Sequence, residues 1–339
     1  MSVNGITIAF GSGPFMAGTP DETRAWLKAL KSHGITTIDT AQGYANSEAA
    51  LGEANAPSQF TIDTKFSLGV GPTPTTKDLV VTSGQESLQK LRTAQVDVYY
   101  LHGPDRRVPW KETLAGIHEL YTQGAFKRLG LSNFLAHEVD EVVAVARENS
   151  FIVPSVYQGN YNAVARRAED EIFPTLRKHK IAFYAYSPIA GGFLSKSQDQ
   201  LLHGSGEDRG RFGGGDFLAQ LYNALYNRPS FLAALDEWER IAENEGVSRA
   251  ELAYRWVVWH SKLDGKLGDA VIIGARNEQQ LGETMAGFKK GPLSADAVER
   301  IEGIWESVKA DAPLDNLEAV ASILAEGKFT SIADEAPSE

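Results

Sequence analysis

The sequence predicts a single (β/α)8 barrel of the α/β class, with a large loop over one end and extra helices near the C-terminus. Two observations lead to this fold class. Short runs of β-branched and aromatic residues alternate with segments of helical periodicity. The chain has 339 residues, enough for one large barrel or for two domains. An open, doubly wound sheet built from the same elements is the alternative.

Eight segments are expected to form strands, because they are short, apolar and bounded by Gly, Pro or polar turns. They cover residues 6–10, 35–39, 61–65, 96–102, 127–132, 155–158, 181–186 and 270–273. The first seven follow one another at regular intervals, whereas the gap before the last is much longer. A strand followed by a helix, repeated eight times, favours a closed parallel barrel.

Helices are expected where apolar residues recur with a period near 3.6. They cover residues 21–33, 77–92, 110–122, 135–147, 165–179, 230–245, 248–259, 277–287 and 294–308. Asp78 and Ser294 are expected to mark the starts of two of them, because short polar side chains cap helix N-termini.

The long gap before the last strand contains a Gly-rich stretch, residues 191–215. This stretch is either a mobile surface loop or a lid that closes over a ligand. The barrel is expected to occupy residues 1–312. Residues 313–339 are expected to form a C-terminal helix and an acidic, partly disordered tail.

Composition narrows the function classes. The net charge of −11 argues against binding to nucleic acid or to an anionic membrane. No apolar run approaches the roughly 18 residues of a membrane span. The absence of cysteine excludes disulfides, thiol catalysis and Cys-ligated zinc. No signal peptide is evident, so the expected location is cytoplasmic. Whether the chain forms a homodimer is left open.

Polar residues follow three neighbouring strands of the predicted barrel. Asp39, Lys65 and His102 stand at strand ends, and Tyr44 lies in the loop after Asp39. Because the carboxyl ends of parallel strands share one mouth, we expect these four side chains to meet there. Taken singly, each has an ordinary structural interpretation, such as a turn cap, a loop residue, an extended surface lysine or a satisfied core histidine.

Together the four side chains form a chemically coherent set. A tyrosine has an ordinary pKa of about 10. A nearby ammonium lowers that value, so Lys65 would make Tyr44 a better proton donor near neutral pH. A desolvated lysine needs a counter-ion, which Asp39 supplies. His102 is placed to orient or polarise a carbonyl oxygen.

At this point the chain resembles the aldo-keto reductases, and within them the aflatoxin-aldehyde reductase branch. Eight motifs carry the resemblance in the family's order between about residue 5 and residue 285. They are IDTAQGY with SEAALG (38–52), TKFSLG (64–69), VDVYYLHGPDR (96–106), KRLGLSNF (127–134), VYQGNYNAVAR (156–166), FYAYSPIAGGFLS (183–195), GRFGGG (210–215) and VIIGARNEQQLGE (271–283).

The resemblance implies an enzyme that reduces aldehydes or activated ketones to alcohols, with NADPH as the cofactor and a small carbonyl compound as the substrate. Tyr44 is then the general acid, Lys65 paired with Asp39 tunes it, and His102 positions the carbonyl. No metal is implied.

The same resemblance assigns the cofactor-binding residues. Near the nicotinamide it places Gly11, Asp39, Ser132, Asn133, Gln158 and Tyr186, the last stacked on the ring. At the pyrophosphate it places Ser187, Ile189, Gly191 and Arg211. At the adenosine end it places Gly274, Arg276, Gln280, Glu283 and Thr284.

Arg276 is the expected partner of the 2′-phosphate, and it lies where a strand leads into a helix N-terminus. Two positions depart from the family pattern at this end. Thr284 stands where many members carry Asn, and Gly274-Ala275 stands where others carry a Lys-Ser pair. The adenine contacts and the cofactor preference therefore stay open.

The substrate side is less sharply marked. The residues expected to face the substrate are Phe15, Met16, Tyr44, His102 and Trp110. Trp110 has a second interpretation, as the start of a helix packed on the barrel. Polar contacts from Asn160, Tyr222 and Asn227 are further candidates. The aromatic-Arg ending usual in the branch is not visible near the C-terminus.

Three other functions are alternatives. A regulatory subunit that binds NADPH with little turnover is the main one, against which the complete Asp-Tyr-Lys-His set argues. A metal-dependent barrel hydrolase needs clustered ligands, but only His102 of the seven histidines stands at a strand end. A Rossmann loop at GSGPFMAG (11–18) lacks the G-x-G-x-x-G spacing.

Overall fold

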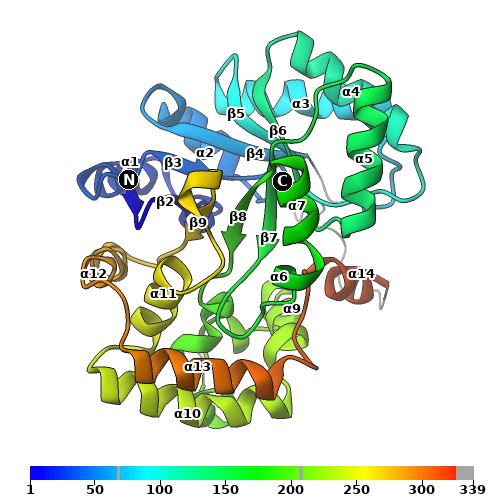
Figure 1. Cartoon of the computed structure of the whole chain (residues 1–339). Coiled ribbons are helices and arrows are strands. Elements are labelled where there is room, and N and C mark those ends of the chain that lie inside the picture. Colours follow the sequence, from blue (N-terminus) through cyan, green and yellow to red (C-terminus); the bar gives the residue numbers. More distant parts are fainter. Residues whose placement is uncertain (67–68, 206–208, 326–339) are drawn as a thin grey trace.

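The computed structural model describes residues 1–66, 69–205 and 209–325, and Figure 1 shows how their elements are arranged. The strands are β1 (Ser2–Val3), β2 (Ile6–Gly11), β3 (Thr37–Asp39), β4 (Thr61–Phe66), β5 (Val96–Leu101), β6 (Phe126–Ser132), β7 (Val156–Asn160), β8 (Ala182–Tyr186) and β9 (Ala270–Ile273). The 3-10 helices used below are η1 (Gly13–Phe15), η3 (Ala190–Ser195) and η5 (Gly210–Phe212).

Helices alternate with these strands. Those that cover the strands up to β8 are α1 (Pro20–Ser32), α2 (Ser47–Glu53), α3 (Lys77–Leu91), α4 (Trp110–Thr122), α5 (Ala136–Glu148), α6 (Ala168–Glu171) and α7 (Phe173–His179). The later ones are α8 (Gln198–His203), α9 (Phe217–Tyr226), α10 (Pro229–Glu245), α11 (Arg249–Trp259), α12 (Glu278–Phe288), α13 (Ala295–Val308) and α14 (Leu317–Ala325).

Strands β2 to β9 form a closed parallel barrel. Each pairs with the next in chain order, and β2 also pairs with β9, from Thr7 opposite Ala270 to Phe10 opposite Ile273. This closure confirms the predicted (β/α)8 fold and excludes the open sheet. Strand β1, which was not predicted, pairs antiparallel with β2.

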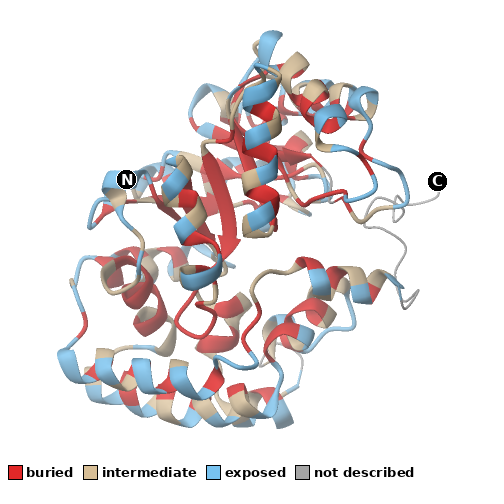
Figure 2. Cartoon of the chain, turned by 45° about the vertical axis from the view of Figure 1, so that its right-hand side comes forward, coloured by how far each residue is buried: buried red, intermediate tan, exposed pale blue. Residues whose placement is uncertain are grey.

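The apolar core has two parts. Small and aromatic side chains such as Ala9, Val98 and Tyr100 fill the interior of the barrel. A larger cluster packs between the strands and the surrounding helices. Figure 2 shows the strands as buried and the outer faces of the helices as exposed. The carboxyl ends of the strands are thus fixed by packing on both sides, which makes them a rigid base for functional side chains.

The predicted helix at 165–179 is wrong in one respect, because α6 and α7 are separate helices. Pro174, at the start of α7, has no backbone N–H to continue a preceding helix. Ser294 caps α13 as predicted, accepting from the Ala297 N–H at 3.2 Å. Asp78 does not cap α3; Thr76 does, at 3.4 Å from the Leu79 nitrogen.

The long gap between β8 and β9 holds α8 to α11 together with η3 and η5, and of these α8 and α9 were not predicted. Helix α14, which packs on α9, matches the expected C-terminal helix. The predicted disorder of the tail falls on residues 326–339, outside the described residues, and so do residues 206–208 of the Gly-rich stretch. Within the described ranges, no helix combines the length and apolar character needed to cross a bilayer.

Candidate active site

Asp39 and Lys65 form a buried ion pair at the carboxyl ends of β3 and β4. Lys65 Nζ donates to Asp39 Oδ2 at 2.6 Å and to the Thr40 carbonyl at 2.8 Å. The Lys65 side chain is fully buried and that of Asp39 almost so. The two residues are 26 positions apart in the sequence, and they meet because β3 and β4 are neighbouring parallel strands.

Tyr44 and His102 complete the group. The Lys65 ammonium lies 4.9 Å from the centroid of the Tyr44 ring, and the His102 ring meets that of Tyr44 edge-on at 5.6 Å. Tyr44 comes from the loop between β3 and α2, and His102 directly follows β5. The structure therefore brings together all four side chains that the strand ends suggested.

Burial and charge set the protonation states of this group. Burial raises the pKa of Tyr44 above its ordinary value, and the opposing effect of Lys65 is smaller. Lys65 therefore lowers the pKa of Tyr44 as predicted, but the net shift is upward because desolvation, which the sequence does not reveal, has the larger effect. Burial, with a further contribution from Lys65, lowers the pKa of His102 to about 3.

Lys65 is subject to opposing effects. Burial alone lowers its pKa, but Asp39 and Tyr44 raise it, and the net direction is upward. At neutral pH the group therefore consists of a protonated Tyr44, a neutral His102 and a Lys65 ammonium held by Asp39. This combination places a proton donor beside a fixed positive charge and an uncharged imidazole.

A cavity of about 2070 Å³ lies over this group. Most of the predicted site residues line it. They are Gly11, Met16, Asp39, Tyr44, His102, Asn133, Gln158, Tyr186, Ser187, Ile189, Gly191, Arg211, Gly274, Arg276, Gln280, Glu283 and Thr284. Lys65 and Ser132 are buried and do not line it.

Amide side chains extend the polar network along one wall. Gln158 Nε2 donates to Asp39 Oδ1 at 2.8 Å, so both carboxylate oxygens of Asp39 have a partner. Asn133 Nδ2 donates to the His102 carbonyl at 2.8 Å and to Ser132 Oγ at 3.1 Å. The Tyr186 hydroxyl donates to Asn133 Oδ1 at 3.0 Å. These bonds fix the orientation of the Tyr186 ring at the wall of the cavity.

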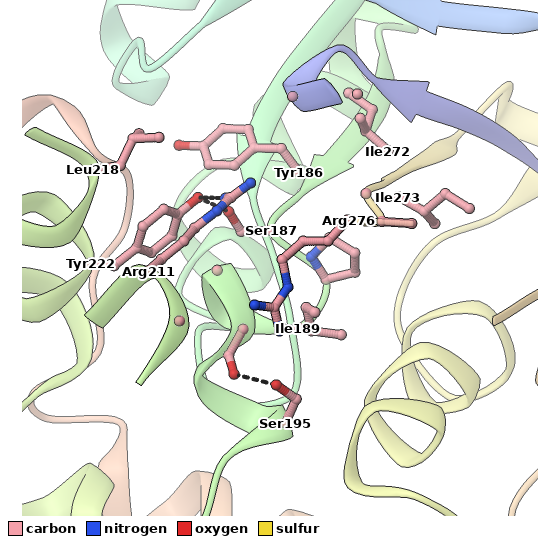
Figure 3. A pocket seen from close by; sticks show the side chains of 18 of the residues that line it. Tyr186, Ser187, Ile189, Ser195, Arg211, Leu218, Tyr222, Ile272, Ile273 and Arg276 are labelled. Carbon is pink, nitrogen blue, oxygen red and sulfur yellow. Dashed lines mark hydrogen bonds between the residues drawn. The ribbon is translucent and has the colours of Figure 1, made fainter. Parts of the chain in front are cut away.

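The next part of the cavity is a turn after β8, shown in Figure 3. The Tyr222 hydroxyl is hydrogen-bonded to two neighbours. It lies 3.1 Å from Ser187 Oγ, and it accepts from the Arg211 guanidinium at 3.4 Å. Gly191 has φ +69°, and a Cβ there would lie 2.1 Å from the Tyr222 ring. Glycine is therefore required at this position both for its backbone angle and for the close approach of the ring.

The far part of the cavity lies where β9 leads into α12. Asn277 caps α12 by accepting from the Gln280 N–H at 2.9 Å, and Gln280 Oε1 accepts from the Arg276 N–H at 3.0 Å. Arg276 is exposed, and its guanidinium lies close to η5: a Cβ added to Gly210 would be 3.9 Å from it. An exposed cation at a helix N-terminus is suited to bind an anionic group.

Two residues expected to face the substrate do not. Phe15 is fully buried and packs against Phe10, with ring centroids 6.3 Å apart. Trp110 starts α4, packs on Phe134 and donates from its indole nitrogen to Glu141 at 2.8 Å. Its second interpretation, as a helix start packed on the barrel, is the one that the structure supports. Neither side chain lines the cavity.

The lining also includes residues that were not predicted, among them a group of apolar side chains. We call this group the apolar wall, and it consists of Phe217, Leu218 and Leu221 from α9 and Val320 and Leu324 from α14. The segment FLAQLYNALY has a helical spacing of apolar residues that could have indicated α9. Its contact with α14 joins residues about a hundred positions apart, which no local pattern reveals.

Asn160 and Asn227, named as further polar candidates, do not line the cavity, whereas Tyr222 does. Asn160 is buried and bonded to the Tyr226 hydroxyl at 2.9 Å. Over the described ranges, no three His, Asp or Glu side chains are grouped to hold a metal ion.

Comparison with known proteins shows the family to which the chain belongs. The model of the aldo/keto reductase family matches residues 7–306. The oxidoreductase sirO of Leptosphaeria maculans is 39% identical over 302 residues, covering 88% of this chain and 90% of the relative. The human aflatoxin B1 aldehyde reductases member 4 and member 2 are 35% and 33% identical, covering 86% and 85% of this chain and 89% and 83% of the relatives. The chain therefore belongs to the aldo/keto reductase family of oxidoreductases.

Proposed function

We propose that this protein reduces aldehydes and activated ketones to alcohols, with NADPH as the hydride donor and Tyr44 as the general acid. One observation carries the proposal: Tyr44, His102 and the buried Lys65–Asp39 pair meet at the cavity. When bound, NADPH supplies the hydride that a carbonyl carbon accepts.

Tyr44 is suited to give the proton. Burial raises its pKa, so the phenol holds its proton at neutral pH, as a general acid must. After transfer to the carbonyl oxygen, the phenolate that remains lies beside the Lys65 ammonium. Because Asp39 holds Lys65 in place, this stabilising charge is already positioned before the proton moves.

His102 is suited to orient the substrate. Its lowered pKa keeps the imidazole neutral at neutral pH, so it forms a hydrogen bond with a carbonyl oxygen without adding a second positive charge. The edge-on contact with Tyr44 brings both groups to the same part of the cavity. A carbonyl oxygen between them contacts the proton donor and the orienting group together.

The cavity suits a dinucleotide with an extra phosphate. Its volume of about 2070 Å³ exceeds the ~300–1,000 Å³ of a pocket for one drug-sized molecule. Asn133 and Gln158 supply amides for the carboxamide, and Arg211 supplies a cation for the pyrophosphate. Arg276, at the start of α12, supplies one for the 2′-phosphate, which favours NADPH over NADH.

The apolar wall indicates the substrate class. Phe217, Leu218 and Leu324 line the cavity and remain only half-buried, so part of their apolar surface faces solvent. A ligand that covers this surface gains free energy from its burial. Carbonyl compounds with an apolar or aromatic body therefore fit this side of the cavity better than small hydrophilic ones.

The test is the decrease of NADPH absorbance with aryl aldehydes, dicarbonyls and aryl ketones. We expect turnover, and we expect Tyr44→Phe to lose at least about a hundredfold in kcat while binding NADPH as before. Tyr121→Phe, an exposed change outside the cavity, is the matched control. Tight NADPH binding without turnover of any carbonyl would refute the proposal, and wild-type turnover in Tyr44→Phe would refute its acid.

A further inference from the structure

Helix α2 begins three residues after Tyr44 and lies beside β3 and β4, the strands that carry Asp39 and Lys65 (Figure 1). Its first two residues, Ser47 and Glu48, are polar, yet they are almost completely buried, at 0% and 2% exposure. Burying a carboxyl group is costly unless it is hydrogen-bonded, so these residues need a structural or functional reason.

Both side chains are bonded to the strands beneath them. Ser47 Oγ lies 2.7 Å from Thr40 Oγ1, and Glu48 Oε1 accepts from Thr64 Oγ1 at 2.6 Å. Thr40 directly follows Asp39, and its carbonyl accepts from Lys65 Nζ. Thr64 directly precedes Lys65. The start of α2 is therefore attached to the chain neighbours of both members of the ion pair.

The start of α2 also contacts the loop that carries Tyr44, which joins β3 to α2. The Ser47 N–H donates to the Tyr44 carbonyl at 3.0 Å. Between them, Ala45 has φ +43°, a left-handed conformation that costs a non-glycine residue of order 1–3 kcal/mol. Such a conformation persists where surrounding contacts determine it, and the bonds of Ser47 and Glu48 are contacts of this kind.

We infer that Ser47 and Glu48 are positioning residues for the reduction: they hold the Tyr44 loop against β3 and β4 and so set the position of the phenol relative to Lys65. Neither lines the cavity, so neither is expected to touch substrate or cofactor. The inference rests on the proposed function, because it assigns their effect to the step in which Tyr44 gives its proton. A misplacement of about 1 Å at that step costs up to about a hundredfold in rate.

The decisive variant is Thr64→Val, which removes the hydroxyl that Glu48 accepts from and keeps the shape of the side chain. We expect kcat to fall about tenfold or more, with KM for the carbonyl and the NADPH dissociation constant within about twofold of wild type. Ser47→Ala is expected to act in the same direction. Glu48→Gln keeps an acceptor oxygen and is expected to stay within about threefold of wild-type kcat, whereas Glu48→Ala is not.

Thr113→Val is the matched control. Thr113 is buried, donates from Oγ1 to the Thr75 carbonyl at 3.1 Å and does not line the cavity. Both Thr→Val variants lose one buried hydrogen bond, so both are expected to lower the melting temperature, Thr64→Val by more because it leaves a buried carboxyl oxygen without that partner. Only Thr64→Val is expected to lose kcat. Equal kcat in the two variants would show a merely structural role and overturn the inference.

The outcome separates this inference from the proposed function. A wild-type protein without carbonyl turnover contradicts the proposed function, and the positioning role is then decided by crystal structures of wild type and Thr64→Val. A Tyr44 phenol that moves by more than about 0.5 Å relative to Lys65 supports the role. A phenol that stays in place overturns it. If Glu48→Ala does not fold, Thr64→Val and Ser47→Ala still decide the question.

Discussion

The Lys65 ammonium donates to the Asp39 carboxylate at 2.6 Å, and both side chains are buried at the end of the barrel. A buried ion pair contributes little net stability, because desolvating the two charges offsets their attraction. Breaking it is different, since the remaining charge is then left without a partner. The folded protein therefore holds the Lys65 ammonium, and with it a positive charge, in a fixed position near Tyr44.

Asp39→Asn is expected to lower the free energy of unfolding by about 3–5 kcal/mol, because it leaves Lys65 buried and uncompensated. Urea unfolding measures this loss. The control is Glu171→Gln, which breaks the exposed Arg167–Glu171 pair and is expected to cost less than about 1 kcal/mol. Similar losses of unfolding free energy in the two variants would mean that water or another polar group compensates the Lys65 charge.

His102 predicts a pH dependence of stability. Its pKa is about 3 in the folded chain, against an ordinary value of about 6.5. Between these two pH values the imidazole is protonated in the unfolded chain and neutral in the folded chain. The free energy of unfolding is therefore highest, as far as His102 is concerned, above pH 6.5, and it declines as the pH falls towards 3. Lys65 and Tyr44, which face His102, are both protonated throughout this range.

His102→Gln is therefore expected to flatten the decline in the free energy of unfolding between pH 6.5 and 4, measured by urea unfolding. His203→Gln, a change at an exposed residue outside the cavity, is the control and is expected to keep the wild-type decline. An identical decline in wild type and His102→Gln would show that the His102 imidazole takes up its proton as readily in the folded protein as in the unfolded chain.

The sequence predicts the barrel and the polar group at its mouth well, because both follow local rules. Short apolar strands end at regular intervals, and parallel strands place their last residues on one side. Asp39, Lys65 and His102 can therefore be grouped from their positions at strand ends. Tyr44 joins them because its loop is only a few residues long.

What could not be predicted depends on packing in three dimensions. In the short loop after β2, η1 turns Phe15 into the core while Met16 lines the cavity, and no periodicity distinguishes such neighbours. The net direction of the Tyr44 pKa shift depends on desolvation, whereas the sequence reveals only the nearby charge. The apolar wall needs the contact between α9 and α14, which are distant in the sequence.

Arg276→Ala is expected to weaken NADPH binding by about 10- to 150-fold, the range for a lost hydrogen bond to a charged group of about 1.5–3 kcal/mol. NADH, which lacks the 2′-phosphate, is expected to lose less than about threefold. Quenching of protein fluorescence measures both dissociation constants. Arg147→Ala, on α5 and outside the cavity, is the control. Equal losses for the two cofactors would refute the assignment of Arg276 to the 2′-phosphate.

Leu218→Asn tests the apolar wall. Leu218 projects from α9 towards the cavity on the side of Tyr186 (Figure 3). Replacing its isobutyl group removes apolar surface that a bulky substrate covers, at about 0.8 kcal/mol per buried CH₂. We therefore expect kcat/KM for an alkyl-substituted benzaldehyde to fall about tenfold, mainly through KM.

Methylglyoxal is too small to reach far along the wall, so its kcat/KM is expected to change less than about twofold in the same variant. Leu202→Asn is the matched control, because Leu202 is 49% exposed on α8 and does not line the cavity. If Leu218→Asn lowers kcat/KM equally for both carbonyl compounds, the change disturbs the cofactor or the catalytic group, and the wall does not select the substrate. A loss confined to the bulky aldehyde assigns that selection to the contact between α9 and α14.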